Sequence, residues 1–330
     1  MKNVVVTGGA GYVGSGLLRA LLQRGYSVHC IDKLDFGGES IVDLMNHPEF
    51  RFYNCDLNDW NRTKAQLDAI QLDAIIHLAA IVGDPACKLY SELATTTNLT
   101  SSIALADYAF ARQIDNFIFA STCSNYGKMK DSNSYVTEES PLAPVSLYAE
   151  LKVAFERYLI SEVPANGVAA TALRFATVYG LSPRMRFDLT VNEFTKELAL
   201  GRKLVVFGEQ FWRPYCHVRD FARAFIAVLE ADRGEVAGEV FNVGDTSENY
   251  TKSMLIEHLL EVFPDAEIEY VQKDEDPRDY RVNCDKIKEK LGFTISARVP
   301  DGIREIQEVL GTKVISNPDD QRYYNIPITQ

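Results

Sequence analysis

The sequence predicts an α/β fold, in which a doubly wound parallel sheet is followed by a smaller C-terminal α/β lobe. Short β-branched runs alternate with longer helical patterns through the first half of the chain, which is typical of parallel strands covered by helices on both faces. A glycine-rich turn follows the first of these runs directly. The length of 330 residues exceeds what a single core usually supports, so a second lobe is expected.

The elements of the first half are predicted from the spacing of their apolar residues. Strands are predicted at Val4–Thr7, Ser27–Ile31, Arg51–Cys55, Ala74–Leu78, Asn116–Ser121 and Ala170–Phe175. Helices are predicted at Ser15–Gln23, Trp60–Leu67, Leu89–Ala111 and Tyr148–Glu162. Strands that alternate with helices in this way form a parallel sheet.

The order of elements is less regular after Gly180, and this part supplies the smaller lobe. The elements predicted there are helices at Leu189–Leu200, Val218–Glu230 and Ser253–Val262, strands at Leu204–Phe207, Val240–Val243, Glu267–Val271 and Tyr280–Asn283, and two further helices. Residues 1–180 and 214–245 are assigned to the sheet domain, and residues 181–213 and 246–330 to the second lobe. The polar stretch from Gly311 to Gln330 is predicted as an arm or a frayed tail.

Charge and composition exclude several classes of protein. The 46 acidic residues exceed the 34 basic ones, and the resulting net charge of −12 would repel nucleic acid and anionic membranes. A phosphate-bearing ligand must then be held by local groups. The six cysteines include no Cys-x-x-Cys pair and the five histidines no helical His-x-x-x-His, so we expect reduced thiols and no metal site. The first residues form no apolar signal stretch, and a cytoplasmic location is expected.

A glycine-rich turn connects the first predicted strand to the first helix and reads Thr7-Gly8-Gly9-Ala10-Gly11-Tyr12-Val13-Gly14. Its glycines allow a tight turn, a close approach of the backbone to a pyrophosphate and close packing of helix on strand, while the helix N-terminus adds amide donors. Asp32 lies 18 residues beyond Gly14, at the end of the second strand. Its carboxylate would bind an adenosine ribose and repel a 2′-phosphate. The pattern predicts a Rossmann-type site for NAD rather than NADP.

Tyr148 and Lys152 form a Tyr-x-x-x-Lys motif on a predicted helix, and the four-residue step places both side chains on one face. A free tyrosine has a pKa of about 10, and a nearby lysine cation and an oxidised nicotinamide are expected to lower it. Tyr148 could then take a proton from a hydroxyl group while hydride leaves the carbon. The motif alone is common on helix surfaces, but beside the glycine-rich turn it predicts a catalytic pair.

Together these motifs resemble those of extended short-chain dehydrogenases/reductases of the NAD-dependent epimerase/dehydratase family. Further matching motifs follow in order along nearly the whole chain: Asp56-Leu57, His77-Leu78-Ala79-Ala80, Ser121-Thr122-Cys123-Ser124-Asn125-Tyr126-Gly127, Arg174-Phe175-Ala176-Thr177-Val178-Tyr179-Gly180 and Arg213-Pro214-Tyr215-Cys216-His217-Val218-Arg219-Asp220. The resemblance implies an enzyme that uses NAD to act on the sugar of a nucleoside-diphosphate sugar. It also implies a homodimer, paired through the predicted helices Leu89–Ala111 and Tyr148–Glu162.

The resemblance also implies roles for individual residues. The implied cofactor residues are Gly8, Gly11, Tyr12, Val13, Gly14, Asp32, Asp56, Leu57, Leu78, Ala79, Ala80, Asn98, Tyr148 and Lys152. Among them, Asp56 and Leu57 would touch the adenine, and Asn98 would support the active-site helix. The implied substrate residues are Thr122, Thr177, Arg213 and Arg278, with the two arginines clamping the diphosphate. Thr122 would hydrogen-bond the reacting sugar oxygen and complete a catalytic triad with Tyr148 and Lys152, whereas Arg184 and Arg186 are predicted to be solvated.

The residues after Thr122 narrow the reaction that the resemblance implies. The family's 4,6-dehydratases carry an Asp-Glu pair there, because eliminating water needs an acid and a base, whereas this chain has Cys123 and Ser124. The family's 3,5-epimerases use a cysteine at the position of Ser124, and Cys123 is expected to be a buried thiol. Thr177 stands where UDP-glucose 4-epimerases carry an asparagine, so the nucleotide and the sugar stay open.

We therefore expect epimerisation at C4 through a transient 4-keto sugar, with NAD as the cofactor. A 4-dehydrogenase or 4-ketoreductase that uses NAD or NADP on the same substrate class is the alternative. A non-catalytic dinucleotide-sensing regulator is an alternative of another class, although it would not need the catalytic triad.

Overall fold

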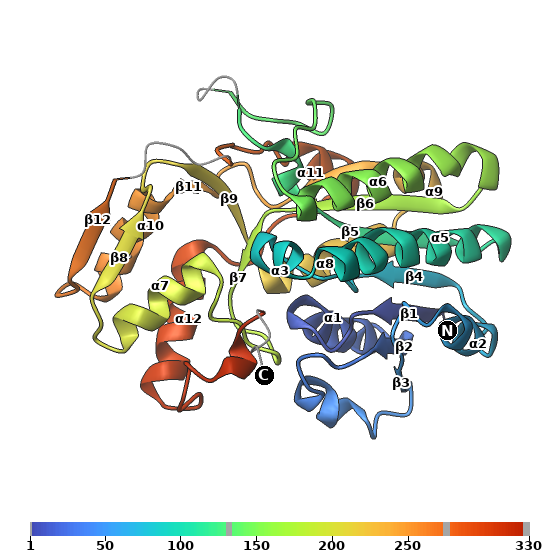
Figure 1. Cartoon of the computed structure of the whole chain (residues 1–330), viewed down its shortest axis with the longest axis horizontal. Coiled ribbons are helices and arrows are strands. Elements are labelled where there is room, and N and C mark those ends of the chain that lie inside the picture. Colours follow the sequence, from blue (N-terminus) through green and yellow to red (C-terminus); the bar gives the residue numbers. More distant parts are fainter. Residues whose placement is uncertain (1, 130–133, 273–277, 326–330) are drawn as a thin grey trace.

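A seven-stranded parallel sheet forms the centre of the larger part of the molecule (Figure 1). The computed structural model describes residues 2–129, 134–272 and 278–325. The strands are β1 (Asn3–Thr7), β2 (Ser27–Asp32), β3 (Phe50–Asn54), β4 (Ala74–His77), β5 (Asn116–Thr122), β6 (Ala169–Phe175) and β10 (Val240–Val243). Their order in the sheet is β10-β6-β5-β4-β1-β2-β3, and every neighbouring pair is parallel. The predicted Rossmann-type fold is confirmed.

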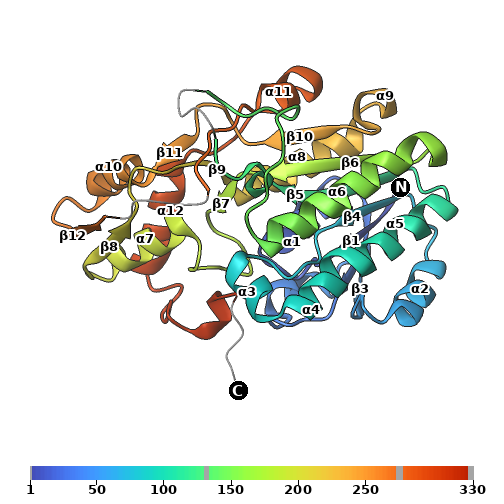
Figure 2. The same ribbon diagram turned by 45° about the horizontal axis from the view of Figure 1, so that its top comes forward.

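Helices cover both faces of this sheet (Figures 1 and 2). On one face, α1 (Tyr12–Gln23) and α8 (Val218–Glu230) share an apolar cluster with side chains of the strands. On the other face, α2 (Trp60–Asp68), α5 (Ser101–Ala111) and α6 (Leu147–Asn166) share a second cluster. Because the central strands are buried on both faces, they read as continuous apolar runs in the sequence.

The single helix predicted at Leu89–Ala111 is wrong. The chain instead forms α3 (Asp84–Leu89), α4 (Ser91–Thr95), a π-helical turn η2 (Thr96–Thr100) and α5. Tyr90, with φ −118° and ψ 53°, leaves the helical conformation and separates α3 from α4. Apolar residues keep their helical spacing through Tyr90 and through the π turn, so the periodicity of the sequence could not reveal either interruption.

The smaller lobe contains a parallel pair of strands, β8 (Leu204–Phe207) and β12 (Ile268–Val271), and an apolar core shared with α7 (Thr190–Ala199), α10 (Lys252–Val262) and α12 (Val299–Gly311). A three-stranded sheet of β7 (Thr177–Tyr179), β9 (Trp212–His217) and β11 (Asn249–Thr251) lies between this lobe and the large sheet (Figure 1). The remaining elements are η1 (Glu39–Leu44), η3 (Cys123–Tyr126), α9 (Arg233–Val236), α11 (Asp285–Leu291) and η4 (Gln321–Tyr323). Within the described ranges, no helix is long and apolar enough to cross a membrane.

The strand predicted at Tyr280–Asn283 is also wrong, because its backbone bonds to separate segments. Tyr280 N donates to Trp212 O over 3.4 Å, while Val282 forms only an isolated bridge with Val136. Strands β7 and β11 were not predicted, because each spans three residues and is too short to show an alternating pattern.

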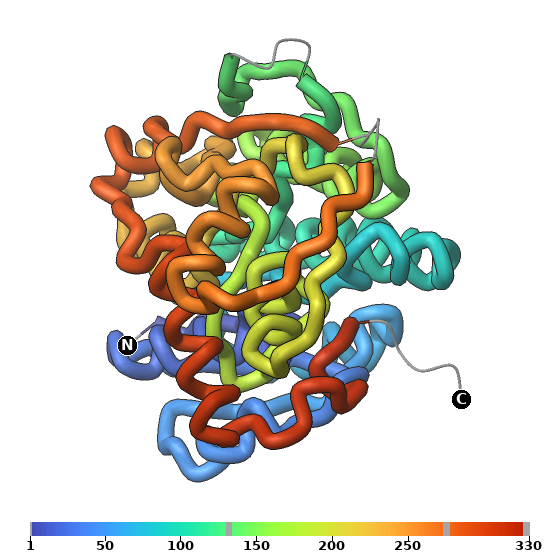
Figure 3. Tube along the Cα trace, turned by 90° about the vertical axis from the view of Figure 1, so that its left-hand side faces the viewer, coloured from blue at the N-terminus to red at the C-terminus, as the bar shows by residue number. Residues whose placement is uncertain are grey.

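The C-terminal segment, defined here as residues 317–325, packs onto the rest of the protein. Tyr323 O accepts a hydrogen bond from Phe187 N (2.9 Å), and the two rings meet edge to face with centres 5.5 Å apart. Lys196 Nζ donates to Tyr324 Oη (2.8 Å). Figures 1 and 3 show this red segment beside the blue N-terminal region. These residues form the arm rather than the frayed tail that the sequence allowed, and the last five residues of that predicted stretch lie outside the described part of the chain.

A buried histidine joins β1, β4 and α5 and makes stability depend on pH. His77 Nδ1 lies 2.8 Å from Thr7 Oγ1, and His77 Nε2 lies 2.9 Å from Ser102 Oγ. Burial lowers the pKa of His77 to about 3, so the folded protein holds the ring neutral. The unfolded chain binds a proton near pH 6.5, and the stability contributed by His77 is therefore complete above that pH and is lost as the pH falls toward 3.

We expect the free energy of unfolding to fall by about 2 kcal/mol between pH 7 and pH 5 because of His77. Urea unfolding at the two pH values measures this fall. A His77→Gln variant removes the titrating ring and should lose less stability over the same interval. Equal losses in the variant and the wild type would contradict the assignment to His77.

Candidate active site

The glycine-rich loop lies where the sheet reverses its order, between β1 and β4, which is the usual ligand site of such sheets. Gly8 has φ +72°, and a Cβ built there would lie 2.7 Å from Ala79 N. A Cβ at Gly14 would lie 2.4 Å from Gly8 O, so α1 approaches the loop this closely only without a side chain. Gly11 is the N-cap residue that precedes α1, and it provides no side-chain cap. The amides of the first turn of α1 have no acceptor within the helix. An anion is the partner that these amides favour.

Asp32 ends β2 next to this loop. Its Oδ2 accepts a hydrogen bond from Ala10 N (3.0 Å), and its Oδ1 accepts one from Leu34 N (2.8 Å). Burial raises the pKa of Asp32, while the two amide bonds oppose that rise. Each oxygen keeps a lone pair for a hydroxyl donor, so the carboxylate is fixed in a position to bind a ribose.

One pocket opens beside the loop and brings together most of the predicted residues. The predicted cofactor and catalytic residues that line it are Gly8, Gly11, Tyr12, Val13, Gly14, Asp32, Asp56, Leu57, Leu78, Ala79, Ala80, Thr122, Tyr148 and Lys152. The pocket is also lined by residues that the sequence reasoning did not assign to it, including Phe36, Arg184, Arg186 and Asn325. A dinucleotide cradle and a tyrosine–lysine pair thus share one cavity.

Asn98 is not among the residues that line this pocket, and it bonds instead to the backbone of its wall. Its Oδ1 accepts a hydrogen bond from Ile81 N (2.8 Å), and its Nδ2 donates to Ile81 O (2.9 Å). The oxygen and the nitrogen of the Asn98 side-chain amide are therefore both bonded to the backbone of Ile81. Ile81 follows Ala79 and Ala80 in the pocket wall. Asn98 fixes the wall from the π turn, and π turns often occur at functional positions.

Tyr148 and Lys152 lie in the first turns of α6, one turn apart. Lys152 is 3% exposed, and its Nζ donates to Ala120 O (2.8 Å). The same nitrogen lies 4.6 Å from the ring centre of Phe119 and 5.9 Å from that of Tyr148. The ammonium is thus held between β5 and the tyrosine ring.

The electrostatics of Tyr148 differ from the prediction. Burial raises the pKa of Tyr148, and Cys87 and Asp84 raise it further. Burial lowers the pKa of Lys152 to about 8, so this ammonium loses its proton as the pH rises through 8. The nearby charge of Arg186 lowers the pKa of Tyr148. The expected role of Lys152 in lowering the pKa of Tyr148 stays a prediction.

Thr122 ends β5 and is nearly buried in the pocket wall. Its Oγ1 accepts a hydrogen bond from Ser124 N (3.1 Å) and so caps the short helix η3. The hydroxyl hydrogen stays available for an acceptor in the pocket. Cys123 is a buried thiol, as expected: its Sγ donates to Arg174 O (3.2 Å), and burial raises its pKa.

A buried ion pair supports the end of β5. Arg174 and Glu156 are 4% and 3% exposed, and Arg174 Nη2 lies 2.6 Å from Glu156 Oε1. Ser121, the residue before Thr122, donates to Glu156 Oε2 over 2.6 Å. Arg174 Nη1 also donates to Tyr126 Oη (2.8 Å). The end of β5 that carries Thr122 is therefore held in place by a buried charged network.

The three residues predicted only for the substrate do not line the pocket. Arg213 lies on β9, with its guanidinium 5.5 Å from the ring centre of Tyr280. Arg278 Nη1 lies 3.0 Å from Asp84 Oδ2. Thr177 begins β7. Their roles toward a substrate stay predictions.

Arg184 and Arg186 line the pocket and are 6% and 9% exposed, so the prediction that they are solvated is wrong. Arg186 forms two hydrogen bonds with Asp188, of 2.9 Å and 2.7 Å. Arg184 lies 4.3 Å from the ring centre of Phe36, and its Nη1 donates to Asn325 Oδ1 (2.5 Å). Asn325 is 141 positions away in the chain, which is why the sequence did not reveal this burial.

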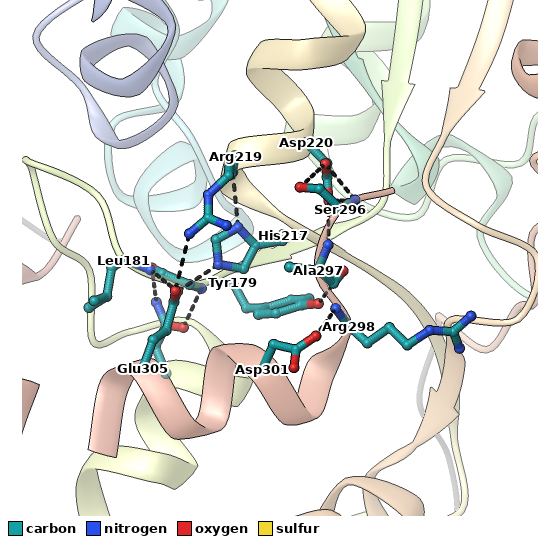
Figure 4. Close-up of polar contacts among 12 residues, drawn as sticks. Tyr179, Leu181, His217, Arg219, Asp220, Ser296, Ala297, Arg298, Asp301 and Glu305 are labelled. Carbon is teal, nitrogen blue, oxygen red and sulfur yellow. Dashed lines mark hydrogen bonds and ion pairs between the residues drawn. The ribbon is translucent and has the colours of Figure 1, made fainter. Parts of the chain in front are cut away.

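Figure 4 shows how the loop that carries these arginines is anchored. Glu305 of α12 points toward His217 and Arg219 at the start of α8. Its Oε1 lies 2.6 Å from His217 Nε2 and accepts a hydrogen bond from Leu181 N (2.7 Å). His217 Nδ1 accepts from Arg219 N (3.1 Å), so the neutral ring carries its proton on Nε2. Leu181 precedes Arg184 by three positions, and this cluster fixes the beginning of their loop.

Comparisons with known proteins agree with this geometry. The model of the NAD dependent epimerase/dehydratase family matches residues 4–244. A UDP-glucose 4-epimerase of Corynebacterium glutamicum is 27% identical over 310 residues, which cover 88% of this chain and 90% of that protein. A dTDP-glucose 4,6-dehydratase of Actinoplanes sp. is 30% identical over 316 residues, which cover 92% of this chain and 95% of that protein.

Solved structures of 4-epimerases are similar over nearly the whole chain. A UDP-glucose 4-epimerase of Thermotoga maritima with UDP-glucose superposes with a TM-score of 0.83 at 27% identity, covering 94% of this chain and 99% of that one. A UDP-N-acetylglucosamine 4-epimerase of Methanobrevibacter ruminantium has the same TM-score and coverage at 25% identity. The relatives thus include epimerases and dehydratases. The residues of the site must therefore be used to distinguish the two reactions.

Proposed function

The chain belongs to the NAD-dependent epimerase/dehydratase family, and from this premise we propose that it inverts the C4 hydroxyl of a nucleoside-diphosphate sugar. One observation carries the proposal: Thr122, Tyr148 and Lys152 line the same pocket as the glycine-rich loop and Asp32. The pocket therefore combines a dinucleotide cradle with a group that can accept a hydroxyl proton.

The residues of the cradle fit NAD. The first-turn amides of α1 suit a pyrophosphate, and the fixed carboxylate of Asp32 suits a ribose diol but not a 2′-phosphate. Bound NAD would supply the carbon that accepts a hydride from C4 of the sugar and returns it to the opposite face. The residues Asp56, Leu57, Leu78, Ala79 and Ala80, together with Tyr12 and Val13, form the rest of the cofactor wall in this proposal.

Tyr148 takes the proton of the C4 hydroxyl in the proposed reaction and later gives it back. Because burial raises its pKa, the phenolate needs nearby positive charge, which Arg186 and the ammonium of Lys152 provide. Thr122 donates its hydroxyl hydrogen to the same sugar oxygen, so the oxygen is held by two groups while its proton moves. Lys152 is kept in place by Ala120 O throughout.

Epimerisation is favoured over dehydration because the two positions after Thr122 offer no acid and no base. Cys123 is a buried thiol whose pKa is raised, and it donates to a backbone carbonyl. Ser124 is a hydroxyl that does not ionise near neutral pH. Removal of water from C5 and C6 would need a proton donor and a proton acceptor there. A UDP-sugar is the first substrate to test, since two similar 4-epimerases are named for UDP-sugars.

Substrate binding is proposed to use Arg213 and Arg278 as a clamp on the diphosphate, with Thr177 facing the nucleotide sugar. A guanidinium matches phosphate oxygens in shape and charge. Arg213 stacks near Tyr280, and Arg278 pairs with Asp84, which is close enough to Tyr148 to raise its pKa. Both arginines thus lie in the region that borders the catalytic helix.

The proposal is tested by incubating the purified protein with UDP-, dTDP-, GDP- and CDP-sugars that carry deuterium at C4. We expect one of them to yield its C4 epimer, with the deuterium kept and no net build-up of reduced nicotinamide. Stoichiometric reduction of NAD or NADP would instead show a 4-dehydrogenase, and stoichiometric oxidation of added NADH or NADPH would show a 4-ketoreductase. Solvent hydrogen on a sugar carbon would show enolisation and overturn the mechanism. NAD binding without turnover of any sugar nucleotide would favour the dinucleotide-sensing regulator.

We also propose that the enzyme works as a homodimer in the cytoplasm. All six cysteines are free and buried, which suits a reducing compartment. The proposed dimer contact involves α5 and α6, by resemblance to the family. Sedimentation equilibrium of the purified protein should give twice the mass of one chain, and a monomer at all concentrations would contradict the pairing.

A further inference from the structure

Arg184 is a buried cation that forms no ion pair with a carboxylate in the part of the chain that the structure describes. Its side chain is 6% exposed and lines the cofactor pocket. Within residues 2–129, 134–272 and 278–325, its guanidinium donates to Asn325 Oδ1 (2.5 Å) and to Tyr324 O (3.2 Å), both uncharged acceptors, and its Nε has no hydrogen-bond partner. Burial and the nearby charge of Arg186 lower the pKa of Arg184 to about 10, although the carboxylates of Asp188 and Asp32 partly oppose this shift. Such a charge is unfavourable unless an anion balances it.

The guanidinium of Arg184 is held by other residues at the edge of the pocket. Its guanidinium lies over the ring of Phe36, in the loop after Asp32. Two residues of the C-terminal segment accept its Nη hydrogens. Asn325 N also donates to Asp188 Oδ2 (3.3 Å), the carboxylate that holds Arg186. The segment therefore positions both arginines at the pocket.

The C-terminal segment is itself fastened at two points. Asp319 lies 2.9 Å from Lys196 Nζ and 2.5 Å from Arg202 Nη2. Tyr323 and Tyr324 pack on an apolar cluster that includes Tyr12 of the glycine-rich loop. Contacts therefore connect the C-terminal segment to the glycine-rich loop.

We propose that Arg184 binds the pyrophosphate of NAD and that the C-terminal segment is a clasp that holds Arg184 there. The proposal rests on the use of NAD in the proposed function. The pyrophosphate is the anion of the dinucleotide, and the amides of α1 that favour it line the same pocket as Arg184. A guanidinium suits phosphate oxygens, and in a chain of net charge −12 the phosphate must be held by such local cations. A clasp of this kind slows NAD release, as an epimerase that reuses one cofactor requires.

An Arg184→Met variant tests the proposed contact, because methionine fills much of the same volume without charge. We expect its affinity for NAD and for ADP to fall about ten- to a hundredfold, the usual loss for one charged hydrogen bond. Its affinity for adenosine, which has no phosphate, should stay unchanged. Calorimetry without any sugar nucleotide measures all three. Arg184→Lys keeps the charge and should recover part of the loss.

Thermal unfolding separates this role from a structural one. Without NAD, Arg184→Met should unfold at the same or a higher temperature than the wild type, because an unbalanced buried charge is removed. The rise in unfolding temperature caused by NAD should shrink. A variant that is less stable without NAD but binds NAD as tightly as the wild type would overturn the proposal. A wild type that does not bind NAD at all would instead overturn the proposed function.

An Asp319→Asn variant tests the clasp, because it weakens the fastening of the segment without touching the pocket. NAD should leave this variant severalfold faster than the wild type in a stopped-flow displacement by ADP-ribose. Glu267→Gln is the matched control, since Glu267 forms an exposed ion pair with Lys203 elsewhere on the same lobe. Equal release rates in Asp319→Asn and the control would show that the segment does not retain the cofactor.

Discussion

A Tyr148→Phe variant is expected to lose about 10²- to 10⁴-fold in kcat, the usual contribution of a positioned proton acceptor. The phenol is the group of the pocket placed to take the substrate proton, since Lys152 Nζ is engaged by Ala120 O and the Thr122 hydroxyl serves as a donor. Removal of one oxygen leaves the ring and its contacts, so the fold and the cradle should be unaffected. The C4-epimerisation assay with saturating NAD gives kcat, and calorimetry gives the NAD affinity.

Tyr158→Phe is the matched control, because Tyr158 lies on the same helix and its hydroxyl bonds only to Asp107 among the described residues. This control should keep wild-type kcat. If Tyr148→Phe also kept wild-type kcat with NAD bound, Tyr148 would not be the proton acceptor. If it lost NAD binding instead, the loss of activity would not bear on proton transfer.

The sheet and the cofactor cradle could be predicted from the sequence because local patterns specify them. Strands buried on both faces appear as continuous β-branched runs, and β1 to β6 lie within about one residue of their predicted positions. Asp32 could be placed because the end of a strand beside the glycine-rich loop is a fixed point of the fold. Tyr148 and Lys152 followed from a four-residue step on one helix.

The parts that the sequence did not show depend on contacts between distant segments. Arg184 is buried by contacts with Asn325 and Phe36. The residues around Arg184 in the sequence do not indicate these contacts. The role of Asn98 depends on a π turn inside a run with helical spacing. The pKa of Tyr148 is raised by burial and lowered by Arg186, which lies on another loop and was expected to be solvated. Each of these features is tertiary, and a single sequence does not encode it locally.

The stability of the site is expected to depend on the buried Glu156–Arg174 pair more than on any exposed ion pair. A Glu156→Gln variant keeps the shape of the side chain but leaves Arg174 as an unbalanced buried cation, which typically costs about 3–5 kcal/mol of unfolding free energy. Urea unfolding measures this loss. Lys64→Gln at the exposed Lys64–Asp68 pair is the control, and its loss of stability should be far smaller because water screens the exposed charges.

Removal of both charges should cost much less than removal of one. A Glu156→Gln and Arg174→Met double variant has no buried charge at these positions, and replacing such pairs by uncharged side chains is often close to neutral. A double variant as unstable as the sum of the single variants would contradict the coupling. Because Ser121 donates to Glu156 Oε2 and precedes Thr122, the double variant should still lose kcat although it folds. Restored stability without restored activity would show that the pair serves to place Thr122 as well as to stabilise the protein.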